Sequence, residues 1–142
     1  MCMRRVVKNK FPRGYTVTAW KVFRESGLPG VLGGLFQTDS RVPKKKWTRD
    51  ERNETLEVGM LYGDKLGECP RLYETGFHCL LDWQDAKDLL KELRQCTQSP
   101  LVLAQVTLGD LTAEGAEHHC GRLMGAAVGK RIRIEKVLGR KN

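Results

Sequence analysis

No part of the 142-residue sequence has an apolar run of the roughly 18 residues that a membrane-spanning helix needs. The stretch from Met1 to Lys10 also lacks the long apolar segment of a secretory signal. The five cysteines are odd in number and share no repeated spacing, which argues against a disulfide framework. We therefore predict a cytoplasmic protein with reduced thiols.

Several enzyme motifs are also missing, including Gly-x-Ser-x-Gly and His-Glu-x-x-His. The Gly33-Gly34 pair lacks the lysine and the following helix of a phosphate-binding loop. A cysteine nucleophile needs a base within reach. His78-Cys79 and His119-Cys120 are adjacent pairs, and adjacent residues of a strand face opposite sides. The sequence therefore favours an interaction protein over an enzyme and leaves catalysis open.

Positive charge is concentrated at the two ends of the chain. The net charge is +8, of which residues 1–14 and 130–142 carry +5 each, and the remainder sums to −2. Basic ends on a near-neutral body predict a polyanionic partner, either nucleic acid, a nucleoprotein or an acidic protein face. Simple solubility with basic, frayed tails would account for the same charges.

Segments rich in β-branched and aromatic residues predict strands, and clusters of Gly, Pro and Asp predict the loops between them. The expected strands are residues 15–24, 31–37, 55–62, 72–80, 101–108 and 131–138. We expect loops at 39–53 and 63–71. The Gly- and Ala-rich residues 110–129 are expected to form one short helix and a loop.

One amphipathic helix is predicted from Trp83 to Gln95, with Asp82 as its N-cap. Its apolar stripe comprises Trp83, Ala86, Leu89, Leu90 and Leu93. The predicted fold is a single α+β domain, mainly antiparallel sheet packed with this one helix. A basic N-terminal arm spans residues 1–14, and the domain with its basic tail spans 15–142.

A candidate binding surface for nucleic acid or a nucleoprotein combines a basic loop with basic strand positions. Three lysines and an arginine surround Trp47, so phosphates can be neutralised while the indole stacks on a base. A solvated loop anchored by a half-buried Trp47 is the alternative. The predicted partner-binding residues are Arg4, Arg5, Lys44, Lys45, Lys46, Trp47, Arg49, Arg131 and Arg133.

His78 is the candidate for chemistry, because it lies where a predicted strand leads into the predicted helix. There it could move a proton or hold a ligand. The alternative is a core histidine held by a backbone carbonyl. A small enzyme would need a cleft that joins His78 to Lys21 or Arg24.

Zinc is a third hypothesis, because cysteine and histidine are its usual ligands. The candidate ligands are Cys69, Cys79, His119 and Cys120. Their spacing is unlike that of zinc modules, since no two cysteines lie two to four residues apart. The leading prediction therefore includes no cofactor.

Four short motifs resemble those of small, uncharacterised proteins of phages and mobile elements. They are Ala19-Trp20-Lys21-Val22-Phe23-Arg24, Gly34-Leu35-Phe36, Trp47 and Gly76-Phe77-His78. Trp20 stands where Tyr is usual and Phe77 where Trp is frequent. The resemblance implies a phage accessory protein in the cytoplasm of a bacterial host. There it would act as an inhibitor of a defence nuclease, in the manner of an anti-CRISPR protein.

A second resemblance is to ADP-ribosyltransferase-like domains. It lies in a basic first strand, a glycine-aromatic strand leading into a helix, and a late acidic residue. It implies an enzyme that uses NAD, with Lys21, Arg24, His78 and Glu135 as its site. The Ser-Thr-Ser element and the Glu/Gln-x-Glu motif of those domains are absent.

Overall fold

The computed structural model describes residues 3–25, 30–34, 41–52, 54–57 and 72–138. Strands account for 62% of this part and a single helix for 13%. In chain order the elements are β1 (Arg5–Lys8), β2 (Thr16–Glu25), β3 (Val31–Gly33), β4 (Arg41–Pro43), β5 (Trp47–Arg49), β6 (Thr55–Glu57), β7 (Leu72–Glu74), β8 (Phe77–Leu80), α1 (Trp83–Cys96), β9 (Leu101–His119) and β10 (Arg122–Leu138).

The predicted α+β class was wrong, because the described part of the chain is nearly all β. The error lies in residues 110–129, which extend two strands instead of forming a helix and loop. Two of their glycines, Gly115 and Gly129, are required by close packing. A Cβ at Gly115 would lie 1.9 Å from the Arg5 carbonyl oxygen, and one at Gly129 would lie 2.6 Å from that of Gly109. Small residues here mark close strand contact rather than irregular chain.

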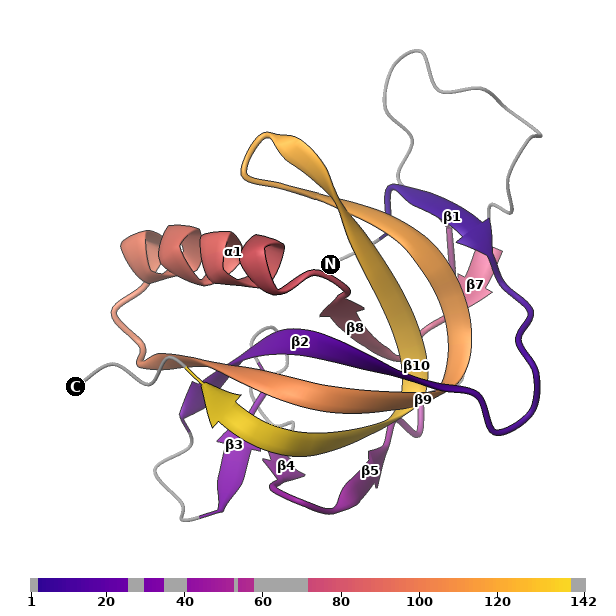
Figure 1. The fold of residues 1–142 in the computed structure, drawn as a ribbon, viewed down its shortest axis with the longest axis horizontal. Helices are drawn as coiled ribbons and strands as arrows, with labels where there is room; N and C mark the ends of the chain where they lie inside the picture. The colour runs from indigo at the N-terminus through magenta and orange to yellow at the C-terminus, as the bar shows by residue number, and fades with distance from the viewer. Residues whose placement is uncertain (1–2, 26–29, 35–40, 53, 58–71, 139–142) are drawn as a thin grey trace.

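The long hairpin of β9 and β10 organises the molecule and curves through its whole length (Figure 1). Its two-residue turn places Cys120 at φ 53° and Gly121 at φ 73°, the left-handed backbone that suits the twist of a tight hairpin. β9 also pairs with β2, β10 pairs with β8, and β8 meets β2 at Trp20 and Leu80. These pairings close the sheet into a small ring.

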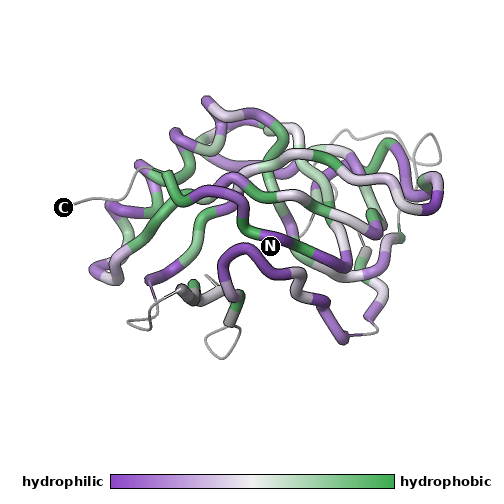
Figure 2. The backbone as a smooth tube through the Cα atoms, turned by 60° about the horizontal axis from the view of Figure 1, so that its bottom comes forward, coloured by the Kyte–Doolittle hydropathy of each residue, from purple (hydrophilic) through white to green (hydrophobic). Residues whose placement is uncertain are grey.

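Apolar side chains form a core on each face of this sheet. The inner core, inside the ring, contains Phe23, Val106, Leu108, Ile132 and Ile134. The helix-side core packs Leu101 and Leu103 against Leu89 and Leu90 of α1. Figure 2 shows hydrophobic and hydrophilic residues alternating along the strands, as expected where each strand has a packed face.

α1 confirms the predicted helix, with its end one residue later than expected. The Asp82 carboxylate accepts a hydrogen bond from the Asp85 backbone N–H at 3.0 Å, which caps the first turn. Arg122, just after the hairpin turn, contacts Asp85 and Asp88 of the helix at 2.8 and 2.7 Å. α1 is not long and apolar enough to cross a membrane, and it is the one helix among the described residues.

The expected N-terminal arm includes β1, which pairs with β9 near Ala116. Met3 and Val6 are fully buried in the helix-side core. The expected loop at 39–53 contains β4 and β5, of which β5 pairs with β10. Residues 35–37 and 58–62 of two predicted strands, and the predicted loop at 63–71, lie outside the described residues.

Candidate functional site

β5 brings the predicted basic loop onto β10. Their antiparallel register pairs Trp47 with Arg133 and Arg49 with Arg131. The guanidinium carbons of Arg131 and Arg133 lie 4.6 and 4.8 Å from the centre of the Trp47 ring, within cation–π range. Trp47 nevertheless remains 39% exposed. An indole flanked by two cations is thus accessible at the surface.

The same pairing continues across the sheet and defines a surface that we call the basic face. Arg131 pairs with Gly109, which pairs with Thr16. Two residues along, on the same side of the sheet, Arg133 lies opposite Thr107, which lies opposite Thr18. Directly paired residues project to one side of a sheet. The basic face therefore comprises Thr16, Thr18, Trp47, Arg49, Thr107, Arg131 and Arg133.

Two carboxylates partly balance the arginines of the basic face. Asp110 Oδ2 lies 2.9 Å from Arg49 Nη1 and 2.9 Å from Arg131 Nε, the latter without hydrogen-bond alignment. Glu135 contacts Arg133 and accepts a hydrogen bond from Thr107 Oγ1 at 3.0 Å. The hydrogen bond from Arg133 holds the pKa of Glu135 below its usual value. The carboxylates orient the arginines without matching their number.

Further positive charge comes from the lysines that precede β5. The Lys45 backbone N–H donates to the Ile134 carbonyl at 3.0 Å, and the Lys45 side chain reaches the Glu135 carbonyl. Lys44 bridges to Ile134 as well. Lys45 and Lys46 are exposed. The structure thus brings residues 44–49 beside Arg131 and Arg133, and their role in binding a partner stays a prediction. Arg4 and Arg5 instead lie beside Ala116, on the other half of β9.

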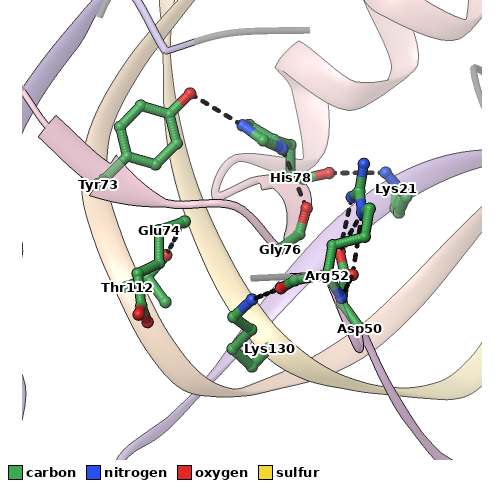
Figure 3. Close-up of polar contacts among 9 residues, drawn as sticks. All are labelled: Lys21, Asp50, Arg52, Tyr73, Glu74, Gly76, His78, Thr112 and Lys130. Atoms are coloured by element: carbon green, nitrogen blue, oxygen red, sulfur yellow. Dashed lines mark hydrogen bonds and ion pairs between the residues drawn. The ribbon is translucent and has the colours of Figure 1, made fainter. Parts of the chain in front are cut away.

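His78 belongs to a separate, largely buried chain of hydrogen bonds (Figure 3). Its Nδ1 lies 3.2 Å from the Gly76 carbonyl oxygen, which can only accept, so Nδ1 carries the proton. Nε2 therefore accepts from the Tyr73 hydroxyl at 3.2 Å. That hydroxyl accepts in turn from the Met3 backbone N–H at 2.9 Å. The direction of every bond follows from the neutral imidazole.

Burial sets the protonation state of His78. The pKa of His78 is lowered from 6.5 to about 4, mainly by loss of solvent; Glu117 opposes this shift and the nearby Lys21 ammonium adds to it. Lys21 Nζ also donates to the His78 carbonyl at 2.9 Å. His78 is therefore neutral at physiological pH, with both ring nitrogens occupied. This is the arrangement of a core histidine held by a backbone carbonyl.

Sequence reasoning missed a third polar cluster, in which Asp50, Arg52 and Lys130 fasten the chain after β5 to β10 (Figure 3). Arg52 Nη2 donates to Asp50 Oδ2 at 2.6 Å, and the Asp50 backbone N–H donates to the Lys130 carbonyl at 2.7 Å. Burial alone would raise the pKa of Asp50, but the hydrogen bonds from Arg52 outweigh it and lower the pKa. The mixed charges of residues 49–52 were the available signal in the sequence.

The residues of the NAD-enzyme hypothesis do not meet. Lys21 contacts His78, but Arg24 Nε donates to the Gly34 carbonyl at 3.0 Å, at the far end of β2. Glu135 lies on the basic face with Arg133 and Thr107. No cleft that joins all four is formed by these contacts.

The candidate zinc ligands among the described residues also have separate surroundings. Cys79 lies in the inner core, where burial raises the pKa of its thiol to about 12. His119 contacts Glu117, and Cys120 Sγ donates to Glu92 on α1 at 3.1 Å. Cys69 lies outside the described residues. Within the described ranges, no three His, Cys, Asp or Glu side chains form a group that could hold a metal ion.

Comparisons with protein-family models, curated proteins and solved structures found no match for this chain.

Proposed function

We propose that the protein binds nucleic acid through the basic face. The observation that carries this proposal is the exposed Trp47 ring with Arg131 and Arg133 beside it on one side of the sheet. Guanidinium groups form strong, directed hydrogen bonds with phosphate. An aromatic ring beside them offers a stacking surface for an unpaired base. Single-stranded nucleic acid presents both groups together.

The surroundings of Trp47 support this assignment. Thr16 and Thr18 line the same face with short hydroxyl side chains that can donate hydrogen bonds, a feature of backbone contacts to nucleic acid. Lys44, Lys45 and Lys46 extend the positive charge beyond β5. Gly109 has no side chain to cover the indole of Trp47; a Cβ there would contact Trp47 Cη2 at 3.6 Å.

In its finer form, the proposal is a non-enzymatic protein that docks on the nucleic acid of a bacterial nucleoprotein complex and inhibits a defence nuclease. This form rests on the resemblance to phage proteins and stays a prediction. The basic face would serve such a protein by occupying the phosphates that the nuclease must contact.

Charge reversal on the basic face tests the proposal. We expect Arg131→Glu with Arg133→Glu to lower the affinity for a labelled single-stranded oligonucleotide by roughly a hundredfold, because two charge-assisted contacts become repulsive. The slope of log affinity against log salt should become shallower by about 1.4, or 0.7 for each lost phosphate contact. Fluorescence anisotropy across a salt series measures both quantities.

The matched control is Lys87→Glu with Lys91→Glu, which changes the net charge equally on exposed positions of α1. It should lower the affinity by less than about threefold, since long-range screening leaves distant charges a small role. Equal losses in the two double variants would indicate nonspecific attraction and contradict the proposal. Absence of binding by the wild-type protein at low salt would contradict it as well.

A further inference from the structure

A second site is indicated by a small cavity beneath α1, whose lining includes none of the basic-face residues. It has a volume of about 20 Å³ and lies between the helix and strands β2, β8 and β9. Its apolar wall includes Trp20, Leu80 and Leu89, and its polar groups are Lys21, His78 and Glu117. Trp20, Lys21 and His78 are each partly exposed, so the cavity is not sealed from solvent.

Glu117 gives this cavity an acceptor that the described residues leave unused. The side chain is 2% exposed, and its Oε1 lies 3.1 Å from His119 Nε2. Among the described residues, no group hydrogen-bonds to Oε2. A buried carboxylate oxygen without a donor is costly, and such oxygens are normally paired with protein or water. The cavity beside it is large enough for one water-sized donor.

Lys21 supplies the complementary donor. An ammonium group has three N–H bonds, and one of these is directed at the His78 carbonyl. The imidazole of His78 offers nothing more, because Gly76 and Tyr73 occupy its two nitrogens. The cavity thus presents one carboxylate and one ammonium among apolar walls. A charged ligand would meet a like charge from one of them, so a neutral ligand with both a donor and an acceptor fits best.

We propose that this cavity receives the amino group of a primary carboxamide from a small neutral ligand, with the rest of the ligand at its opening. The amide N–H donates to Glu117 Oε2, and the amide carbonyl accepts from Lys21 Nζ. The amino group is the size of a single water molecule and takes the place of one within the 20 Å³ cavity. Trp20 covers the apolar part of the ligand at the entrance. The site is independent of nucleic-acid binding at the basic face.

Acetamide is the simplest probe, with acetate and methylammonium as charged ligands of similar size. In ¹H–¹⁵N spectra of the full chain, acetamide should cause saturable shifts at Lys21, His78, Glu117 and the first turns of α1. The two charged probes should bind at least tenfold more weakly. Shifts that never saturate, or equal binding of all three probes, would overturn the proposal.

Glu117→Gln tests the carboxylate, since it keeps the shape and removes the charged acceptor. We expect it to weaken acetamide binding at least tenfold, with spectra that remain dispersed. Ala86→Val tests the space, because it adds two methyl groups to the cavity wall from α1. Ala86→Val should abolish the saturable shifts. If Glu117→Gln does not fold, this result tests the proposed site on its own. Wild-type binding by either folded variant would refute the site.

Discussion

The basic face and the His78 cluster (Met3, Tyr73, Gly76 and His78) differ in how their polar groups are exposed and paired. On the basic face, Arg131, Arg133 and their carboxylate partners Asp110 and Glu135 are all partly exposed. Around His78, the two imidazole nitrogens, the Tyr73 hydroxyl and the Met3 backbone N–H each have a specific hydrogen-bond partner in a largely buried setting. Exposed charges contribute little to stability because water screens them. Buried neutral groups become costly once a partner or the right protonation state is lost. The first region is therefore free to serve binding, and the second constrains the fold.

The pH dependence of stability should separate the two regions most strongly. His78 has a pKa of about 4 in the folded protein, against 6.5 when unfolded. The unfolded chain therefore binds the extra proton between these values, so stability is full above pH 6.5 and falls as the pH drops toward 4. The expected loss is about 3 kcal/mol at most. Chemical denaturation at a series of pH values measures it.

His78→Gln provides the control for that titration, because other groups also titrate in acid. Lys21, Glu117 and the N-terminal ammonium are the charged groups that act on the imidazole. The difference in unfolding free energy between wild type and variant should change across pH 4 to 6.5. A constant difference would show that His78 protonates as easily in the folded state as in the unfolded one.

Tyr73→Phe should have the next largest effect. It removes the hydroxyl that accepts from the Met3 N–H and donates to His78 Nε2, so two buried groups lose their partner. We expect a loss of about 1–3 kcal/mol in unfolding free energy. Oligonucleotide affinity should stay within about twofold of wild type, because the basic face is untouched. A large loss of affinity in the folded variant would mean that the two regions are coupled.

Trp47→Ala should have the opposite effect to Tyr73→Phe: it should lower oligonucleotide affinity and change stability the least. Loss of the stacking surface should reduce oligonucleotide affinity about tenfold. The unfolding free energy should fall by about 1 kcal/mol or less, since the ring is partly exposed and contributes mainly its contacts with the two arginines. Trp47→Phe should recover part of the affinity. If Trp47→Ala unfolds the protein instead, the ring is a core element and not a binding surface.

Local patterns in the sequence were enough to predict α1 and much of the basic face. The helix has a clear stripe and a capping Asp82. The alternation of Arg131 and Arg133 with Ile132 and Ile134 predicted which side chains face out. Short β5 could not be foreseen, because it depends on pairing with a strand more than 80 residues later in the sequence.

The cavity residue Glu117 was missed because its segment was expected to be a helix and loop. On a strand, the period of two places Glu117 on the side of the buried Ala113. The burial of Glu117 can be predicted in this way only if residues 110–129 are assigned to strands. Small residues there were misleading, since Gly115 and Gly129 are needed for contacts made with distant segments. Contacts of this kind leave no local signal.

The junction of β2 and β8 has a mechanical consequence for the ring. A single residue pair, Trp20 and Leu80, joins these strands, whereas β9 and β10 are paired along nearly their whole length. Between β2 and β8, the ring is therefore closed by a single residue pair. Trp83 of α1 packs on Trp20, and the Lys21 ammonium reaches across to β8. We therefore expect local opening of the pairing between β2 and β8 at lower free-energy cost than unfolding of the β9–β10 hairpin.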